Sequence, residues 1–300
     1  MLRSRYVLGL AAAAVVVLAT RDVQSQAVIR SGIDLVNVTV TVTDKDGRFI
    51  RGLTQDDFVV RDDGQPQEIL SFSAERVPVS LGIVLDVSGS MTDLQMSTAR
   101  RAIRRFAYDL LDPEDELFLA EFAATTRMLQ TWTTDRGTLD RALDRARDRR
   151  RGSQWGSVVY DAVRATLPFA GTGVHTKKAL LIISDGHDRG SDTSVKRLKE
   201  IIRSMDTMVY ALAVGARGTR IEAGKLREFT DETGGRTEVI HGFEGLEEAT
   251  ARLGDELSQQ YVLGYSSPHA KDGRWHTIKV EVRGHKDARV RARTGYVAVS

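Results

Sequence analysis

The sequence predicts an α/β fold in which a doubly wound, mostly parallel sheet is inserted into a β-sandwich formed by the N- and C-terminal segments. Between residues 77 and 260, short apolar runs alternate with longer segments of helical period, as in βαβ units. On either side of that region, apolar and polar residues alternate as in half-buried antiparallel strands. A composition of 41% hydrophobic and 28% charged residues excludes wholesale disorder.

Residues 1–27 are predicted to be a secretory signal peptide. A short basic region at residues 2–5 precedes the apolar run at 6–19, and Ser25, Gln26 and Ala27 form a small-x-small cleavage site. The apolar run is shorter than the roughly 18 residues that cross a bilayer, so cleavage is favoured over the alternative of an uncleaved anchor. We therefore expect an exported protein, periplasmic or secreted, without a transmembrane segment after signal cleavage.

The N-terminal β segment, residues 28–76, begins with strict alternation of valines with asparagine and threonines at 35–43. This pattern is typical of a half-buried antiparallel strand. Two Asp/Gly-containing turns follow, one at 44–47 and the other at 62–65, and the second separates apolar runs that predict strands. The segment is therefore predicted to be all-β.

The central domain, residues 77–260, carries the βαβ pattern. Its continuous apolar runs predict buried strands at 81–85, 117–122, 180–183 and 208–214. Helical periodicity predicts helices near 103–111, 135–150, 157–170, 193–206, 221–234 and 244–260. Aspartates interleave with arginines at helical spacing in residues 140–151, which favours an ion-paired helix face over a nucleic-acid patch.

The C-terminal segment, residues 261–300, is predicted to be β again, with strands at 261–265, 277–283 and 290–299. Segments this short are marginal as independent folding units. We therefore expect residues 261–300 to pack with 28–76 as one sandwich, which places the two ends of the central domain close together.

Charge and cysteine content exclude several functional classes. Removal of residues 1–27 takes away three arginines and one aspartate, which lowers the formal net charge from +2 to zero. A neutral chain has no electrostatic reason to bind nucleic acid. The sequence has no cysteine, which excludes disulfides, thiolate catalysis, cysteine-ligated zinc and an acylated lipoprotein anchor.

Candidate metal ligands follow the apolar strands. Asp86, Ser88 and Ser90 come directly after the first core strand, Asp185 follows the strand at 180–183, and Ser157 stands at the start of a predicted helix. Because ligands bind at the carboxyl ends of strands in open α/β sheets, these side chains are expected to converge. Carboxylates and hydroxyls suit a divalent cation, Mg²⁺ first, with Mn²⁺ or Ca²⁺ as alternatives.

A competing interpretation makes Ser88 or Ser90 a helix N-cap and lets Asp86 complement the helix dipole. The six histidines show no tight metal-ligand spacing in the sequence. No catalytic constellation and no organic cofactor motif stands out, so the sequence gives no residue a catalytic or cofactor-binding role.

The ligand pattern resembles the metal-ion-dependent adhesion site (MIDAS) of von Willebrand factor type A domains, which reads Asp-x-Ser-x-Ser, then a distant Thr, then a distant Asp. Asp86, Ser88, Ser90 and Asp185 match that pattern, and Ser157 takes the place of the Thr. The chain also resembles a family of secreted von Willebrand factor A-related bacterial proteins first grouped from acidobacteria. The motifs that carry this second resemblance lie at 35–40, 56–58, 63–64, 86–91, 160–162, 184–186, 261–265 and 293–296.

These resemblances imply a non-enzymatic, metal-dependent adhesion or interaction module whose cation captures an Asp or Glu of a protein partner. Partner contacts are expected from the rim of the site, at Thr92, Asp93, Trp155, His187 and Asp188. Two alternatives remain open. One is a metal-assisted hydrolase in which His187 or Asp188 activates water, and the other is a structural component of envelope assembly.

Overall fold

The computed structural model describes residues 35–89, 92–146, 156–215, 218, 220–269 and 271–298. The predicted signal peptide, residues 1–27, lies outside them. The described residues belong to one unit, which spans Asp34–Ser300. None of the helices within these ranges has the length and apolar character needed to cross a membrane.

The central sheet has six strands in the order β10-β9-β8-β5-β6-β7. All neighbours run parallel except β7, which runs antiparallel to β6 at one edge. The strands are β5 Val79–Asp86, β6 Glu116–Phe122, β7 Thr126–Thr133, β8 Lys177–Ser184, β9 Met208–Gly215 and β10 Thr237–His241. Every residue of β5, β6 and β9 is buried, as expected for strands covered on both faces.

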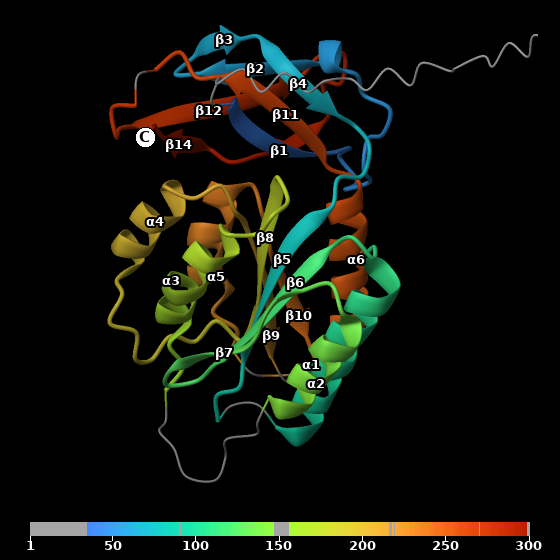
Figure 1. Ribbon diagram of the computed structural model, residues 1–300, viewed down its shortest axis with the longest axis vertical. Helices are drawn as coiled ribbons and strands as arrows, with labels where there is room; N and C mark the ends of the chain where they lie inside the picture. Colours follow the sequence, from blue (N-terminus) through green and yellow to red (C-terminus); the bar gives the residue numbers. More distant parts are fainter. Residues whose placement is uncertain are drawn as a thin grey trace, which may run out of the picture. The chain divides into compact units, whose positions relative to one another are not determined.

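Helices lie on both sides of this sheet, with α1, α2 and α6 on one face and α3, α4 and α5 on the other (Figure 1). The α-helices are α1 Asp93–Arg105, α2 Arg136–Arg145, α3 Val159–Ala170, α4 Val195–Arg203, α5 Ala223–Thr230 and α6 Leu246–Ser258. A π-helical turn, η2 Phe106–Leu110, extends α1, and 3₁₀ turns occupy η1 Gln55–Asp57, η3 Asp231–Thr233 and η4 Phe243–Gly245. The doubly wound α/β arrangement predicted from the sequence is confirmed.

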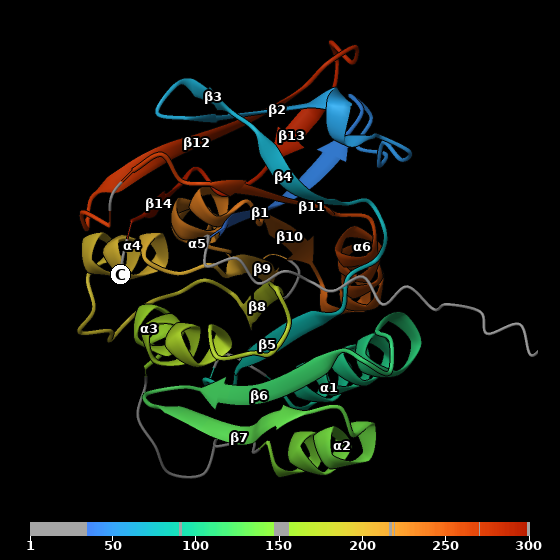
Figure 2. The same ribbon diagram turned by 45° about the horizontal axis from the view of Figure 1, so that its top comes forward.

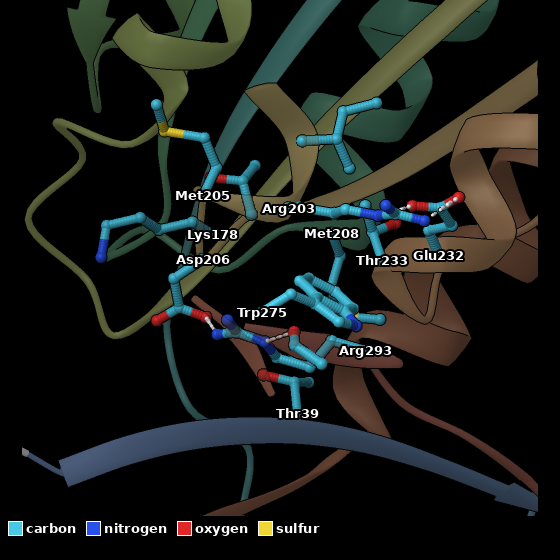
Figure 3. Close-up of a pocket in the computed structure, with 13 residues that line it drawn as sticks. Thr39, Lys178, Arg203, Met205, Asp206, Met208, Glu232, Thr233, Trp275 and Arg293 are labelled. Atoms are coloured by element: carbon cyan, nitrogen blue, oxygen red, sulfur yellow. Dashed lines mark hydrogen bonds and ion pairs between the residues drawn. The ribbon is translucent and has the colours of Figure 1, made fainter. Parts of the chain in front are cut away.

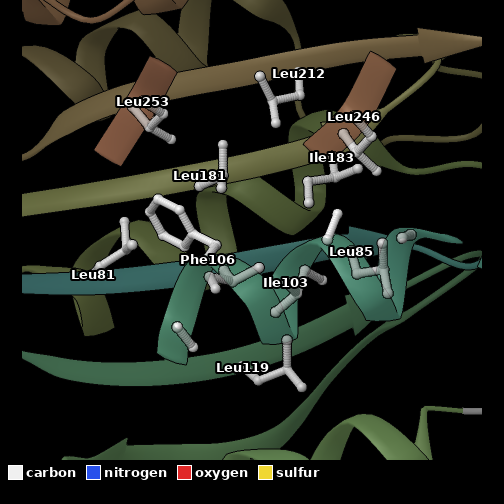
Figure 4. Close-up of a cluster of buried hydrophobic side chains, with 14 of the residues drawn as sticks. Leu81, Leu85, Ile103, Phe106, Leu119, Leu181, Ile183, Leu212, Leu246 and Leu253 are labelled. Carbon is white, nitrogen blue, oxygen red and sulfur yellow. The ribbon is translucent and has the colours of Figure 1, made fainter. Parts of the chain in front are cut away.

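Each face of the sheet has its own apolar core. On the first face, Leu81 and Ile183 from the strands pack with Ile103, Phe106 and Leu253 from the helical layer (Figure 4). On the second face, β5 and β6 approach closely at Gly82. A Cβ atom there would lie 2.1 Å from the Phe118 ring, so only glycine leaves room for that buried ring.

The N- and C-terminal segments form two antiparallel four-stranded sheets, ordered β13-β1-β11-β4 and β14-β12-β2-β3 (Figure 2). Their strands are β1 Leu35–Thr43, β2 Phe58–Asp62, β3 Gln65–Gln67, β4 Ile69–Ser73, β11 Tyr261–Ser266, β12 Trp275–Val282, β13 Arg289–Arg291 and β14 Gly295–Val297. Valines of β1 and β2 share one apolar core with Leu263 and Tyr265 of β11. The predicted β-sandwich is thus present, while the domain boundaries assigned from the sequence stay predictions.

The structure adds detail that the sequence pattern does not predict. The central sheet contains the four strands predicted from the apolar runs and two further strands, β7 and β10, at its edges. The turn after β2 leads into β3, whereas β4, which was expected to follow that turn directly, pairs with β11. After the first turn, Phe49 makes an isolated bridge to Thr43.

Ion pairs line a small pocket where the C-terminal segment meets the α/β region (Figure 3). Arg293 Nη1 lies 3.0 Å from Asp206 Oδ1, and Arg203 Nε lies 3.0 Å from Glu232 Oε2. The Arg203 guanidinium also stands 5.0 Å from the centre of the Trp275 ring, a cation–π contact. Because these charges are engaged with one another, we assign this pocket to packing.

Candidate metal centre

The candidate centre is built around Asp86, the last residue of β5, whose side chain is buried. Its Oδ1 accepts a hydrogen bond of 2.9 Å from the Ser88 backbone N–H. Its Oδ2 accepts one of 3.1 Å from the Ser157 hydroxyl and one of 2.7 Å from the Ser184 hydroxyl. Groups from three separate stretches of the chain therefore meet at one carboxylate.

The sheet topology explains this convergence. The strands β5 and β8 are parallel neighbours with Leu85 opposite Ile183, so they bring Asp86 and Ser184 to the same sheet edge. In open α/β sheets, this carboxyl edge is where ligands bind. The loops that follow β5 and β8 therefore begin at the same sheet edge, where the sequence predicts that a cation binds.

A left-handed glycine shapes the turn after β8. Gly186 has a φ of +79°, and its N–H donates a hydrogen bond of 3.0 Å to the Ser184 hydroxyl. A Cβ at Gly186 would lie 2.9 Å from the carbonyl oxygen of Glu222. Both the backbone angle and the lack of space therefore require glycine. This turn carries Asp185, whose Oδ1 accepts a hydrogen bond from the His187 N–H at 3.0 Å.

Ser157 is held in place by its neighbours on both sides. Its carbonyl accepts a hydrogen bond of 2.9 Å from the Arg189 N–H, and the following Val158 N–H donates one of 3.0 Å to the carbonyl of Ala123. Ser157 is buried and stands just before α3. Backbone contacts thus fix the hydroxyl that reaches Asp86.

The electrostatics of the centre favour a bound cation. Burial raises the pKa of Asp86, and the negative charge of Asp185 raises it further, while hydrogen bonds from Ser184 and Ser88 act in the opposite direction. The negative charge of a buried carboxylate beside a second carboxylate is costly, and either a proton or a bound cation offsets that cost. Carboxylate and hydroxyl oxygens of Asp86, Ser88, Ser157 and Asp185 are donors that fit Mg²⁺, Mn²⁺ or Ca²⁺.

The structure describes only some of the other predicted ligands and rim residues. Ser90, Trp155 and the Asp93 side chain lie outside the part of the chain that the structure describes. Thr92 is exposed, but its hydroxyl accepts the Gln95 N–H at 3.2 Å and caps α1. The metal-ligand assignments as a set remain predictions.

His187 and Asp188 follow the Asp185 turn, and both are partly buried. His187 Nδ1 lies 3.2 Å from Asp185 Oδ1. Asp188 Oδ1 accepts the Ser191 hydroxyl at 2.6 Å and the Tyr160 N–H at 3.4 Å, so this carboxylate holds the loop together. The partner-contact role predicted for them stays a prediction.

A family model described as the von Willebrand factor type A domain matches residues 81–187. The match begins in β5 and ends two residues after Asp185, so it spans both strand ends of the centre. The chain contains a von Willebrand factor type A domain. Its resemblance to the narrower, acidobacterial family stays a prediction, and no curated protein matches the sequence.

Solved structures share the fold of this von Willebrand factor type A domain at low sequence identity. BatB from Bacteroides thetaiotaomicron aligns with a TM-score of 0.50 and 18% identity, over 60% of this chain and 98% of its own. A von Willebrand factor type A protein from Catenulispora acidiphila aligns with a TM-score of 0.50 and 13% identity, over 89% of this chain and 75% of its own. A mutant of the PilB minor pilin from Streptococcus sanguinis aligns with a TM-score of 0.51 and 13% identity, over 61% of this chain and 62% of its own. These likenesses establish the fold.

Sequence reasoning missed a second group of metal-ligating side chains, which lies in the antiparallel sheets and outside the von Willebrand factor type A match. Asp62, Asp63, His269 and His276 each offer one ligand atom, and these atoms all lie within 4.8 Å of one another. Neither histidine is close to the aspartates in the sequence, so spacing gave no signal. The pairing of β2 with β12 in the folded chain brings the two parts of the cluster together.

Proposed function

We propose that the protein is an exported interaction module that captures an acidic side chain of a partner protein through a divalent cation at Asp86. In this proposal Asp86, Ser88, Ser90, Ser157 and Asp185 hold the cation, with Mg²⁺ as the physiological ion. The cation keeps one coordination position open for an Asp or Glu of the partner. The MIDAS of other von Willebrand factor type A domains, which the sequence pattern resembles, supplies the template.

The observation that carries the proposal is the convergence of Ser157 and Ser184 on the buried carboxylate of Asp86. Three of the five proposed ligands are hydroxyls, which neutralise little of a cation's charge, so a divalent ion held by them and two carboxylates still attracts an anionic oxygen at its open position. A partner carboxylate provides such an oxygen. Capture of a carboxylate therefore follows from the chemistry of the donor set.

Binding is favoured over the alternative of a metal-assisted hydrolase. A hydrolase needs a base that can activate water beside the ion. Of the two candidate bases, Asp188 is already engaged by Ser191 and Tyr160. His187 lies beside Asp185 on the same turn, a position equally suited to the rim of a binding site. A structural role in envelope assembly is the remaining alternative.

Export is part of the proposal and rests on residues 1–27. Their basic start, apolar run and small-x-small end are those of a cleaved signal. Expression in a bacterial host followed by N-terminal sequencing of the periplasmic protein tests this. A new N-terminus after Ala27 supports export, whereas an intact N-terminus in the cytoplasm contradicts it.

The function itself is tested with immobilised peptides that present Asp or Glu in varied apolar and polar contexts. Binding of the full chain is measured by biolayer interferometry in Mg²⁺ and again with chelator. Matched peptides carrying Asn or Gln at the acidic position serve as controls. The proposal predicts binding that needs both Mg²⁺ and the carboxylate, and that is lost in Asp86→Ala.

Two outcomes contradict the proposal. One is peptide binding that persists in chelator or in Asp86→Ala, which places the interaction elsewhere on the surface. The other is equal binding of acidic and amide peptides, which removes the partner carboxylate from the mechanism.

A further inference from the structure

The cluster formed by Asp62, Asp63, His269 and His276 joins the two ends of the chain. Asp62 is the last residue of β2, and Asp63 begins the turn that follows, with a φ of +46°. His276 lies on β12, and His269 lies in the connection between β11 and β12. Since Ile278 pairs with Asp62, the histidines stand beside the end of β2, although they come from the C-terminal segment.

The ligand atoms are spaced as they would be around one ion. His269 Nε2 lies 3.1 Å from Asp62 Oδ1 and 3.4 Å from Asp63 Oδ2. His276 Nδ1 lies 2.9 Å from Asp63 Oδ2. Bond lengths of about 2.0–2.1 Å to zinc place the ligands of a tetrahedral site about 3.3 Å apart. These three separations lie close to this value, and the other ligand-atom pairs lie within 4.8 Å.

Each carboxylate has one oxygen held by the protein and the other directed at the histidines. Asp62 is fully buried, and its Oδ2 accepts the Tyr265 and Tyr296 hydroxyls at 2.8 and 2.9 Å. Asp63 Oδ1 accepts the N–H and the hydroxyl of Thr277 at 2.8 and 3.0 Å. Outer contacts of this kind orient metal ligands in proteins.

His276 is oriented in the same manner. His276 Nε2 lies 3.2 Å from Asp272 Oδ1, which leaves Nδ1 directed at Asp63. A proton on Nε2, held by Asp272, gives Nδ1 a free electron pair for a metal. The two imidazole rings stack with centroids 3.6 Å apart and an angle of 13° between their planes. Because the electron pair of a ring nitrogen lies in the plane of its ring, His269 must turn out of this stack for both histidines to ligate one ion.

We propose that Asp62 Oδ1, Asp63 Oδ2, His269 Nε2 and His276 Nδ1 bind a zinc ion with a structural role. Two imidazoles favour zinc over Mg²⁺ and Ca²⁺, which prefer oxygen ligands. Four protein ligands complete a tetrahedron and leave no position for substrate, as in structural zinc sites. The side chains of His269 and Asp63 are partly exposed, at 25% and 41%, and give the ion a route of entry.

The zinc ion would link the turn after β2 to the β11–β12 connection. The ligands His269 and Asp62 are 207 residues apart in the sequence, so the ion closes a loop that contains the whole von Willebrand factor type A domain. A link that closes a long loop stabilises the folded chain by restricting the unfolded one. In a chain without cysteine, this ion takes the place of a disulfide between the terminal segments.

The test uses the full chain carrying Asp86→Ala, so that metal at the sheet edge does not contribute. The protein is stripped with chelator and titrated calorimetrically with Zn²⁺, and Co²⁺ is added separately to record its visible spectrum. The proposal predicts one zinc per chain, the intense absorption of tetrahedral Co²⁺, and a higher melting temperature with zinc. Adding His269→Ala or Asp63→Asn should weaken zinc binding by more than about 100-fold and abolish the Co²⁺ absorption.

Two features keep the test decisive. Asn tolerates the left-handed backbone at position 63 and keeps an acceptor for Thr277, so Asp63→Asn preserves the fold where a larger change would not. His285→Ala removes an exposed histidine from the same half of the chain and should leave zinc binding unchanged. A folded Asp86→Ala protein that binds no zinc overturns the proposal, as does equal zinc affinity in the His269→Ala and Asp63→Asn variants.

Discussion

The hydroxyl of Ser184 donates a hydrogen bond of 2.7 Å to Oδ2 of Asp86 and so joins the ends of two neighbouring strands. The same hydroxyl accepts the Gly186 N–H at 3.0 Å. One small side chain therefore orients the buried carboxylate and also fixes the turn that carries Asp185. Ser184 is a positioning residue of the candidate centre.

Ser184→Ala should weaken Mg²⁺ binding about 10-fold, since Asp86 loses a partner that fixes its orientation. The smaller side chain fits the buried strand, so the fold should persist. Titration calorimetry gives the affinity, and circular dichroism verifies the fold. Ser194→Ala is the matched control. It removes the N-cap of α4 and should cost about 1 kcal/mol of stability without changing Mg²⁺ affinity. Equal affinity in Ser184→Ala and wild type would remove the positioning role.

Gly186→Ala should lower the free energy of unfolding by about 2 kcal/mol, because alanine is strained at a φ of +79° and its Cβ would meet the Glu222 carbonyl. The turn that carries Asp185 should shift, and Mg²⁺ affinity should fall as well. Urea denaturation measures the stability. The matched control, Gly224→Ala, lies in α5 with open space around it and should be neutral or stabilising. A neutral Gly186→Ala would contradict the described turn.

Lys177 should make stability depend on alkaline pH. Burial, together with the charge of Arg76, lowers its pKa to about 8, although Asp115 acts in the opposite direction. Its Nζ donates a hydrogen bond to the carbonyl of Leu257. Between pH 8 and about 10 the folded state releases a proton that the unfolded state still holds, so stability rises with pH in this window.

The variant Lys177→Met removes this titration and leaves all other groups in place. From pH 7.5 to 10, wild type should gain about 2 kcal/mol of unfolding free energy relative to Lys177→Met. Denaturation at each pH measures the difference between the two proteins, in which other titrating groups cancel. Parallel stability curves over this range would show that Lys177 titrates normally in the folded protein.

Glu256 on α6 is a buried charge that several partners share. Its Oε1 accepts the Tyr210 hydroxyl at 3.0 Å and Arg291 Nη2 at 2.5 Å, and its Oε2 lies 3.0 Å from Arg236 Nε. Because Arg291 belongs to β13, this carboxylate ties the sandwich to the α/β region. Glu256→Gln should destabilise the protein by about 2 kcal/mol, since both arginines lose a charged partner and are only partly exposed.

Glu247→Gln is the control for Glu256→Gln in the same helix. Glu247 pairs with Arg101 and Arg105 near the surface, and exposed pairs contribute less than about 1 kcal/mol. Thermal melting at low and high salt compares the two variants. A larger effect from Glu247 than from Glu256 would contradict the assignment of the junction to Glu256.

The sequence predicts the centre of the fold well because buried parallel strands are continuously apolar. Every residue of β5 is buried, and its apolar run from Leu81 to Leu85 is accordingly recognisable. No residue of the edge strand β7 is fully buried, and the strand mixes threonine, arginine and glutamine with apolar residues, so neither alternation nor an apolar run reveals it. The sequence pattern therefore fails to predict strands at the edge of the sheet.

The same contrast applies to the two candidate metal sites. Asp86 and Asp185 follow apolar strands, so strand order alone predicts that they meet. The role of Ser184 depends on a side-chain orientation that no local pattern encodes. The meeting of His269 with Asp62 depends on the register of β12 against β2, in which Ile278 lies opposite Asp62. That register is a tertiary property of the sandwich.

The cation site at Asp86 is tested by Mg²⁺ titration of the metal-stripped full chain, carried out with His269→Ala so that the histidine cluster does not contribute. We expect one Mg²⁺ per chain, and no detectable binding when Asp86→Ala is added to a protein that remains folded. Absence of Mg²⁺ binding in the folded His269→Ala protein, or binding that survives Asp86→Ala, would contradict a cation site at the edge of the central sheet.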